Sequence, residues 1–203
     1  EKLIRLEDRY ADLLVRAAGA AGFASITAHR ARAWLDLNRG PEDLDRTMLV
    51  EAKGAGLAAA LTRKLTGQMM SARARGVLGL IPRRLPDCGE LWARPLPAEE
   101  AQARLSNYHA PYHAAIEALL RTRRQALGAA VLLDVHSMPP LPAEWGQEAA
   151  PDIVIGDLFG MSAPDRLVAP MMELARAHNF TPALNSPYAG GYVLRRHGRP
   201  AKG

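Results

Sequence analysis

The sequence predicts a domain of the α/β class with a mixed, mainly parallel sheet flanked by helices. Short apolar runs with β-branched residues at 131–138 and 152–157 predict buried strands. Segments at 98–128 and 164–178 predict helices, and an alternation of strands and helices is typical of parallel α/β sheets. A length of 203 residues suits one large domain, so we expect residues 1–203 to form a single α/β domain.

In the amino-terminal third, the first predicted element is an amphipathic helix over residues 3–18. Apolar residues recur there at spacings of three and four, and Gly19 and Gly22 end the pattern. Residues 31–39 predict a strand that runs into a Gly40-Pro41 turn. The segment 42–78 has poor periodicity, with some helix expected around 56–66. Such long excursions are usually functional lids or mobile segments.

The clearest helical pattern covers residues 98–128. Acidic residues stand near its amino end and basic residues near its carboxyl end, as the helix dipole favours: Glu99, Glu100, Arg121, Arg123 and Arg124. Gly128 is expected to end this helix. Pro111 is expected to kink the helix or split it in two, because proline cannot continue the backbone hydrogen bonding.

The carboxyl-terminal half continues the alternation. Pro139 and Pro140 forbid the continuation of the strand at 131–138, and the run at 152–157 predicts a second strand. We expect a helix over about 164–178, followed by a strand around 180–185. This strand leads into the segment Asn185-Ser186-Pro187-Tyr188-Ala189-Gly190-Gly191-Tyr192.

His136 is a candidate metal ligand because it stands at the end of a predicted strand, where α/β proteins place their chemistry. Asp134 lies two residues earlier, on the same face of an extended strand, and is suited to orient the imidazole ring. A histidine with ordinary hydrogen bonds at a strand end explains the motif equally well.

Three segments end predicted strands on polar residues, at 36–39, 134–137 and 185–188, and in a parallel sheet their ends can converge on one crevice. Asn38 and Arg39 place an amide beside a guanidinium, which suits a carboxylate or a carbonyl oxygen gaining negative charge. An ordinary surface arginine is the alternative. For His109 and His113, a core or surface role in the long helix is favoured over metal ligation.

The composition excludes several classes of protein. The net charge of +5 comes from scattered arginines without a nucleic-acid-binding motif, so we expect no nucleic-acid partner, and arginine also suits an acidic small-molecule substrate. No apolar run approaches about 18 residues, so no membrane partner is expected. A single cysteine, Cys88, and a charged amino terminus without a secretory signal indicate the cytoplasm. Nothing in the sequence predicts the oligomeric state.

Taken together, the segments resemble the N-formylglutamate amidohydrolase (N-formylglutamate deformylase) family in order and approximate spacing over nearly the whole chain. The Asp-Leu-Asn-Arg and Asp-x-His elements are also similar to aspartoacylase and, more remotely, to the zinc carboxypeptidases. The residues that carry the resemblance are Arg32, Leu35-Asp36-Leu37-Asn38-Arg39-Gly40-Pro41, Gly76-Val77-Leu78-Gly79-Leu80-Ile81-Pro82-Arg83, Pro111-Tyr112-His113, Leu133-Asp134-Val135-His136-Ser137-Met138, Asp152-Ile153-Val154-Ile155-Gly156-Asp157 and Asn185-Ser186-Pro187-Tyr188-Ala189-Gly190-Gly191-Tyr192.

The resemblance implies a phosphorylase/hydrolase-like three-layer fold that binds one zinc ion. His136 is then a metal ligand, and Glu7 or Asp8 supplies an acidic ligand, with Asp8 preferred; a solvated helix face is the alternative for these two residues. The resemblance also implies that Arg32, Asn38 and Arg39 contact the substrate. Asn185 and Tyr188 are further candidates for substrate binding.

Two parts of the family pattern have no counterpart in the sequence. Family members usually begin with a strand that ends in His-Ser-Gly, and they continue past the segment that corresponds to 198–200 into a strand with a glutamate suited to general-base catalysis. We expect the chain to lack the family's first and last strands, either as the central part of a longer enzyme or as a degenerate relative. The catalytic base stays unassigned, because Glu144 and Glu148 match no motif.

The leading hypothesis is a zinc-dependent amidohydrolase that cleaves the N-formyl or another N-acyl amide of an acidic amino acid. The favoured substrate is N-formyl-L-glutamate, which would give formate and L-glutamate. The alternative is a non-catalytic binding module for acidic metabolites that retains the arginine pocket of this fold.

Overall fold

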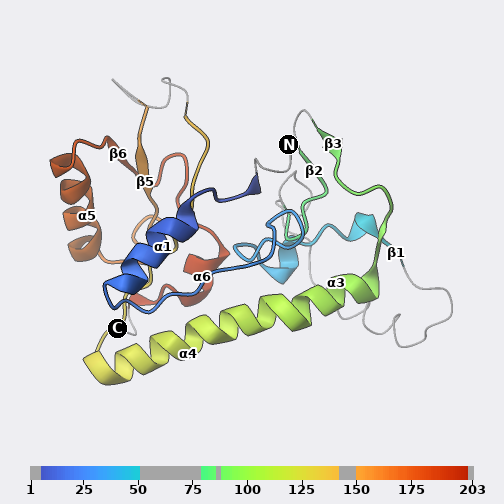
Figure 1. Cartoon of the computed structure of the whole chain (residues 1–203), viewed down its shortest axis with the longest axis horizontal. Helices are drawn as coiled ribbons and strands as arrows, with labels where there is room; N and C mark the ends of the chain where they lie inside the picture. The colour runs from blue at the N-terminus through green and yellow to red at the C-terminus, as the bar shows by residue number, and fades with distance from the viewer. Residues whose placement is uncertain (1–5, 51–78, 86–87, 142–149, 201–203) are drawn as a thin grey trace. The chain divides into compact units, whose positions relative to one another are not determined.

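The structure, a computed structural model, describes residues 6–50, 79–85, 88–141 and 150–200. The chain divides into two compact units (Figure 1). Unit 1 consists of Glu1–Glu7 and Ile26–Ala115, and unit 2 consists of Asp8–Ser25 and Ile116–Gly203. Each unit is described by itself, and the expectation of a single domain stays a prediction. The expected helix at 56–66, the motif residues 76–78, Glu144 and Glu148 lie outside the described residues.

Unit 1 contains two small sheets. Strand β1 (Leu49–Val50) pairs in parallel with β4 (Leu96–Pro97), and β2 (Arg84–Leu85) pairs antiparallel with β3 (Gly89–Glu90). Two short 3₁₀ helices, η2 (Pro41–Asp43) and η3 (Arg46–Met48), precede β1. Asp45 caps η3 by accepting a hydrogen bond from the backbone N–H of Thr47 at 2.9 Å, which satisfies one of the free amides at the helix start.

The core of unit 1 is apolar and lies between these strands and helix α3 (Ala98–Arg104). Its members are almost fully buried; they are Leu35, Leu44, Met48, Leu80, Ile81, Leu96, Ala101 and Leu105. Partly buried rings of Trp34, Trp92 and Tyr108 pack against this cluster. The core therefore anchors both the beginning of the long helix and the segment around residue 35 that precedes Asn38 and Arg39.

The predicted helix at 98–128 is present, but it is not uniform. Helix α3 passes into a π-helical turn, η4 (Leu105–His109), which passes into α4 (Ala110–Leu127). Pro111 lacks an N–H, and in an α-helix its ring would clash with the carbonyl of Asn107, four residues earlier. The π turn contains Asn107, so the helix widens there and continues through the proline. Gly128 ends the helix in a left-handed conformation at φ 79°, as predicted.

Unit 2 contains a parallel strand–helix–strand arrangement. Strands β5 (Ile153–Ile155) and β6 (Pro182–Leu184) pair in parallel and are connected through helix α5 (Asp165–Ala177). Parallel strands need such a crossover. The elements predicted at 152–157, 164–178 and 180–185 are therefore confirmed. Two more helices belong to this unit, α1 (Ala11–Ala20) and α6 (Tyr192–His197).

The predicted helix at 3–18 is wrong over the described residues 6–10, because α1 begins only at Ala11. The residue before it, Tyr10, has a left-handed φ of 64°, which breaks the helical path. The apolar side chains of Leu13 and Leu14, which carried the amphipathic pattern, are exposed.

Two predicted strands are also wrong. Residues 31–39 form turns, and residues 129–141 have no regular secondary structure. In the first segment, N–H groups make turn hydrogen bonds and the N–H of Asp36 donates to the carbonyl oxygen of Leu80, while three carbonyl oxygens accept from side chains of the long helix, as described below. In the second, Val131 and Leu133 are each 63% exposed, so the face expected to be buried faces solvent. The described part of the chain is thus mixed α/β with small sheets. None of its helices combines the length and the hydrophobicity that a membrane span requires.

Candidate active site

The residues proposed to bind substrate in unit 1 gather around the carboxylate of Asp36, whose side chain is 5% exposed. One carboxylate oxygen accepts a hydrogen bond from Arg32 Nε at 2.9 Å and lies 3.5 Å from Arg39 Nε. The other oxygen accepts a hydrogen bond from the backbone N–H of Asn38 at 2.9 Å. The structure therefore brings Arg32, Asn38 and Arg39 together, and their contact with a substrate stays a prediction.

The groups of this arrangement suit an anion. Two guanidinium groups flank the buried carboxylate of Asp36. The side chains of Arg32 and Arg39 keep 29% and 17% of their surface exposed, so both retain an accessible part. A guanidinium in low-dielectric surroundings binds a carboxylate or phosphate more strongly than in water.

The backbone of residues 34–39 is held by three side chains of the long helix. Arg104 donates a hydrogen bond to the carbonyl oxygen of Trp34 at 2.8 Å. His113 Nε2 donates to the carbonyl oxygen of Leu37 at 3.1 Å, and His109 Nε2 donates to that of Arg39 at 2.8 Å. A carbonyl oxygen can only accept, so Nε2 carries the proton in both histidines. These contacts replace the strand pairing that was expected for this segment.

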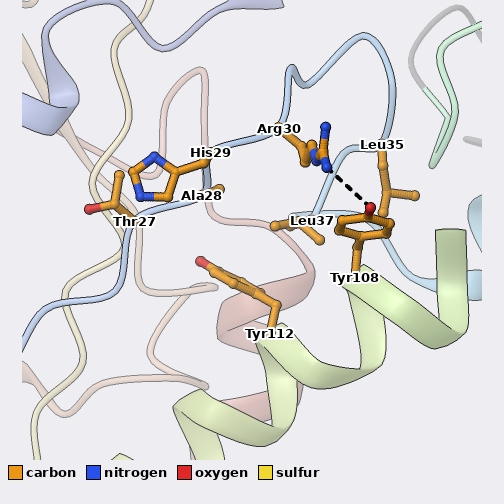
Figure 2. A pocket seen from close by; sticks show the side chains of 8 residues that line it. All are labelled: Thr27, Ala28, His29, Arg30, Leu35, Leu37, Tyr108 and Tyr112. Atoms are coloured by element: carbon orange, nitrogen blue, oxygen red, sulfur yellow. Dashed lines mark hydrogen bonds between the residues drawn. The ribbon is translucent and has the colours of Figure 1, made fainter.

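A pocket of about 160 Å³ in unit 1 adjoins the same segment and is mostly apolar. Figure 2 shows its lining, which is Thr27, Ala28, His29, Arg30, Leu35, Leu37, Tyr108 and Tyr112. The guanidinium of Arg30 stands 5.0 Å from the ring centroid of Tyr108 and donates a hydrogen bond to its hydroxyl at 3.2 Å. Arg32, Asn38 and Arg39 do not line this pocket, so it is distinct from the cluster around Asp36.

In unit 2, the imidazole of His136 lies between two carboxylates. Its Nδ1 is 3.0 Å from Asp8 Oδ2, and its Nε2 is 3.1 Å from Asp134 Oδ2. The other oxygen of Asp8 accepts a hydrogen bond from the backbone N–H of Ser137 at 3.2 Å. The predicted contact of Asp134 with His136 is present, and Asp8 is the acidic residue of the 7–8 pair that reaches the histidine; Glu7 is exposed.

These contacts set the protonation of His136. Partial burial lowers the pKa of the imidazole, but hydrogen bonds and charge interactions with Asp134 and Asp8 outweigh the burial and raise the pKa from 6.5 to about 10. At neutral pH the ring is therefore an imidazolium between two carboxylates. A cation is favoured at this point of unit 2, either a proton on the ring or a metal ion in its place.

The donor types fit zinc, but the set is partial. Zinc takes imidazole nitrogen and carboxylate oxygen, and protein sites supply at least three such ligands. Asp8 and His136 offer one of each. Among the residues that the structure describes, no group of three histidine, cysteine, aspartate or glutamate side chains is arranged to hold a metal ion. The metal roles of Asp8 and His136 stay predictions.

The segment after β6 is joined to the end of β5 by Asn185, which has a left-handed φ of 60°. Its amide donates to Asp157 Oδ1 at 2.7 Å and accepts from the backbone N–H of Asp157 at 3.0 Å. Gly156 allows a close approach, since a Cβ there would lie 2.7 Å from the backbone of Ala189. The amide of Asn185 thus has a structural partner, whereas Tyr188 is 50% exposed. A substrate role for either stays a prediction.

The three segments expected to converge on one crevice are divided between the units. Residues 36–39 belong to unit 1, and residues 134–137 and 185–188 belong to unit 2. Their convergence stays a prediction. The sequence analysis did not predict that Asp36 lies at the centre of the arginine cluster. It also did not predict that Arg104 and His109 hydrogen-bond to the backbone of residues 34–39. An aspartate between Arg32 and Arg39, at helical or turn spacing from both, was the available signal.

The whole chain, residues 1–203, matches the family model described as FGase, N-formylglutamate amidohydrolase. The chain belongs to this family. Among curated relatives, it is similar to an N-formylglutamate deformylase of Pseudomonas aeruginosa, with 27% identity over 88% of this chain and 59% of the relative. It is also similar to an N-formylglutamate deformylase of Pseudomonas putida, with 29% identity over 64% of this chain and 49% of the relative.

A solved structure shares the fold. The crystal structure of N-formylglutamate amidohydrolase from Ralstonia eutropha JMP134 superimposes with a TM-score of 0.83 and 28% identity, over 98% of this chain and 69% of the other. The chain spans about half to three fifths of the length of the curated relatives it matches. The family resemblance that the motifs predicted is confirmed.

Proposed function

We propose that this chain acts in a zinc-dependent amidohydrolase that hydrolyses N-formyl-L-glutamate to formate and L-glutamate. The observation that carries the proposal is the cluster of Arg32, Asn38 and Arg39 around Asp36, in a chain of the N-formylglutamate amidohydrolase family. We further propose that the small parallel sheets belong to a phosphorylase/hydrolase-like three-layer fold with a mixed, mainly parallel sheet. The reaction is placed in the cytoplasm, consistent with a single cysteine.

The substrate fits the charge of the cluster in unit 1. N-Formyl-L-glutamate carries two carboxylates, and one of them would bind the guanidinium groups of Arg32 and Arg39. One carboxylate oxygen of Asp36 lies 2.9 Å from Nε of Arg32 and 3.5 Å from Nε of Arg39, so the orientation of both guanidinium groups is set before the substrate arrives. Fixed donors remove part of the entropy cost of aligning the substrate. The amide of Asn38 would then bind a second oxygen of the substrate, its carboxylate or the scissile carbonyl.

The metal would be held by Asp8 and His136 together with further ligands. When bound, zinc would polarise the formyl carbonyl and lower the pKa of a coordinated water toward about 7. Asp134 would keep the imidazole ring of His136 oriented, since it contacts the second ring nitrogen. The backbone N–H of Ser137 would hold Asp8 through its other oxygen.

A second candidate function is a non-catalytic binding module for acidic metabolites. It is favoured by the partial ligand set, because the described residues place two proposed ligands and no third around His136. Such a module keeps the arginines of unit 1 and needs no metal. Metal content and hydrolysis therefore separate the two functions.

The test is formate release from N-formyl-L-glutamate, with chelator and after zinc is added back. If the chain is part of a zinc-dependent enzyme, chelator should stop formate release and added zinc should restore it. N-Formyl-L-glutamine, in which an amide replaces the side-chain carboxylate, should be a much poorer substrate. Arg39→Lys should raise KM for N-formyl-L-glutamate about tenfold, because lysine cannot present the planar fork. The exposed Arg16→Lys is the matched control. Substrate binding without hydrolysis by zinc-loaded protein would instead establish the binding module.

A further inference from the structure

The π turn in the long helix has a geometric consequence for the residues that face the segment 34–39. In an α-helix with 3.6 residues per turn, successive residues are about 100° apart, so residues five apart point about 140° away from each other. A π turn bonds residues five apart, which brings them onto one face. Arg104 and His109 are five apart across η4, and His113 follows His109 by four. All three therefore reach the same segment.

These side chains are buried to an unusual degree for polar groups. Arg104, His109 and His113 are 3%, 2% and 0% exposed. The two imidazole rings lie 4.4 Å apart between centroids and support each other by contact. Buried polar side chains persist when hydrogen bonds satisfy them. Here the acceptors of the histidine hydrogen bonds are the carbonyl oxygens of Leu37 and Arg39.

The two histidines donate hydrogen bonds to the carbonyl groups directly before Asn38 and directly after Arg39. His113 holds the carbonyl that precedes Asn38, and His109 holds the carbonyl of Arg39 itself. The backbone N–H of Asn38 is held by Asp36 at 2.9 Å. Within the described residues, 37–39 pair with no strand, so these contacts and the turn hydrogen bond from the N–H of Arg39 to the carbonyl oxygen of Asp36 fix their backbone.

We propose that His109 and His113 are positioning residues, placed on one face by the π turn, that fix Asn38 and Arg39 for binding the substrate. This inference rests on the proposed function for its substrate. Neither histidine touches the substrate in this role. They act through the backbone of the segment, so their loss should weaken substrate binding more than it slows the chemical step.

The test compares two amides at each histidine. In His109→Gln and His113→Gln, the side-chain N–H lies at about the reach of Nε2 and can still donate to the carbonyl. In His109→Asn and His113→Asn, the N–H lies at about the reach of Nδ1 and falls short. The two substitutions have similar polarity, so a difference between them reports the position of the donor. Ser106→Ala, on the exposed side of the π turn, is the control.

For N-formyl-L-glutamate, we expect the Asn variants to lose about tenfold in kcat/KM, mainly through KM, since one lost hydrogen bond is worth up to about this factor. The Gln variants should stay within about threefold of the unchanged protein. Equal kinetics for Asn and Gln variants, or a loss confined to kcat, would overturn the proposal.

A second measurement does not depend on hydrolysis. Hydrogen exchange of the backbone amides at 38–40 should quicken in the Asn variants and stay slow in the Gln variants. Unchanged exchange in the Asn variants would overturn the role of the histidines in holding the segment. If the unchanged protein releases no formate, the proposed function fails and the substrate part of the inference with it, while the exchange result still decides whether the histidines hold the segment.

Discussion

Replacing Asp36 by asparagine tests the cluster on which substrate binding is proposed to depend. The carboxamide has nearly the same shape, and its oxygen can still accept the hydrogen bond from the N–H of Asn38. Its NH₂ group then faces Arg32 Nε, which is also a donor. The substitution therefore removes the charge-assisted hydrogen bond at 2.9 Å and the ion pair with Arg39 at 3.5 Å.

The expected loss of stability follows from burial. A hydrogen bond to a charged group contributes about 1.5–3 kcal/mol, and leaving a buried charge without its partner costs more. The Asp36 side chain is 5% exposed, but Arg32 retains 29% exposure and can partly recover water. We therefore expect Asp36→Asn to lower the free energy of unfolding by about 2–4 kcal/mol.

Urea unfolding followed by tryptophan fluorescence measures this loss. Trp34 and Trp92 lie in unit 1, and replacing Trp145 by phenylalanine leaves only these two as reporters. Glu90→Gln is the matched control, because Glu90 also pairs with two arginines in unit 1 but is 49% exposed. Its midpoint should shift little, since water and salt screen exposed pairs. The reasoning is refuted if both variants shift the midpoint equally, or if Asp36→Asn costs less than about 1 kcal/mol at an unchanged m-value.

Three further predictions concern unit 2. Gly156→Ala should destabilise the chain by about 1–3 kcal/mol because the new Cβ would meet backbone at 2.7 Å, whereas Gly19→Ala in helix α1 should stabilise it slightly; thermal unfolding compares the two. Burial, followed by the charge of Arg196, lowers the pKa of His197 below 6.5 in the folded protein. The contribution of neutral His197 to stability is therefore complete above pH 6.5 and is lost as the pH falls through the folded pKa. His197→Asn should flatten the pH dependence of Tm between about pH 7 and 5. Asp8→Asn and His136→Asn should each abolish zinc retention measured by elemental analysis, and retention by both variants would exclude these residues as ligands.

Local sequence signals were sufficient for several elements. The charge gradient along 98–128 and Gly128 predicted the extent of the long helix, because capping and dipole interactions depend on near neighbours in the chain. The apolar runs at 152–157 and 180–185, with a helical segment between them, predicted β5, α5 and β6 for the same reason. The motif set also predicted the family.

The strand expected at 31–39 shows what local signals miss. Its apolar residues are compatible with a strand, but a strand requires a partner for its backbone groups. In the structure, turn hydrogen bonds and the carbonyl oxygen of Leu80 satisfy N–H groups of the segment, and side chains about 70 residues away in the sequence donate to its carbonyl oxygens. The apolar run at 131–135 failed similarly, since burial depends on what packs against a segment.

The sequence by itself determined the long helix at 98–128, the parallel strand–helix–strand arrangement of unit 2 and several residue types of the candidate site. Only the tertiary structure decided that Asp36 gathers Arg32 and Arg39, that Asp8 meets His136 across 128 residues, and that a π turn aligns Arg104, His109 and His113. The physical reason is that spacing alone does not decide these contacts: Arg32 and Arg39 lie within four residues of Asp36, whereas Asp8 and His136 are 128 residues apart. Their energy depends on burial and donor geometry, which exist only once the chain has folded.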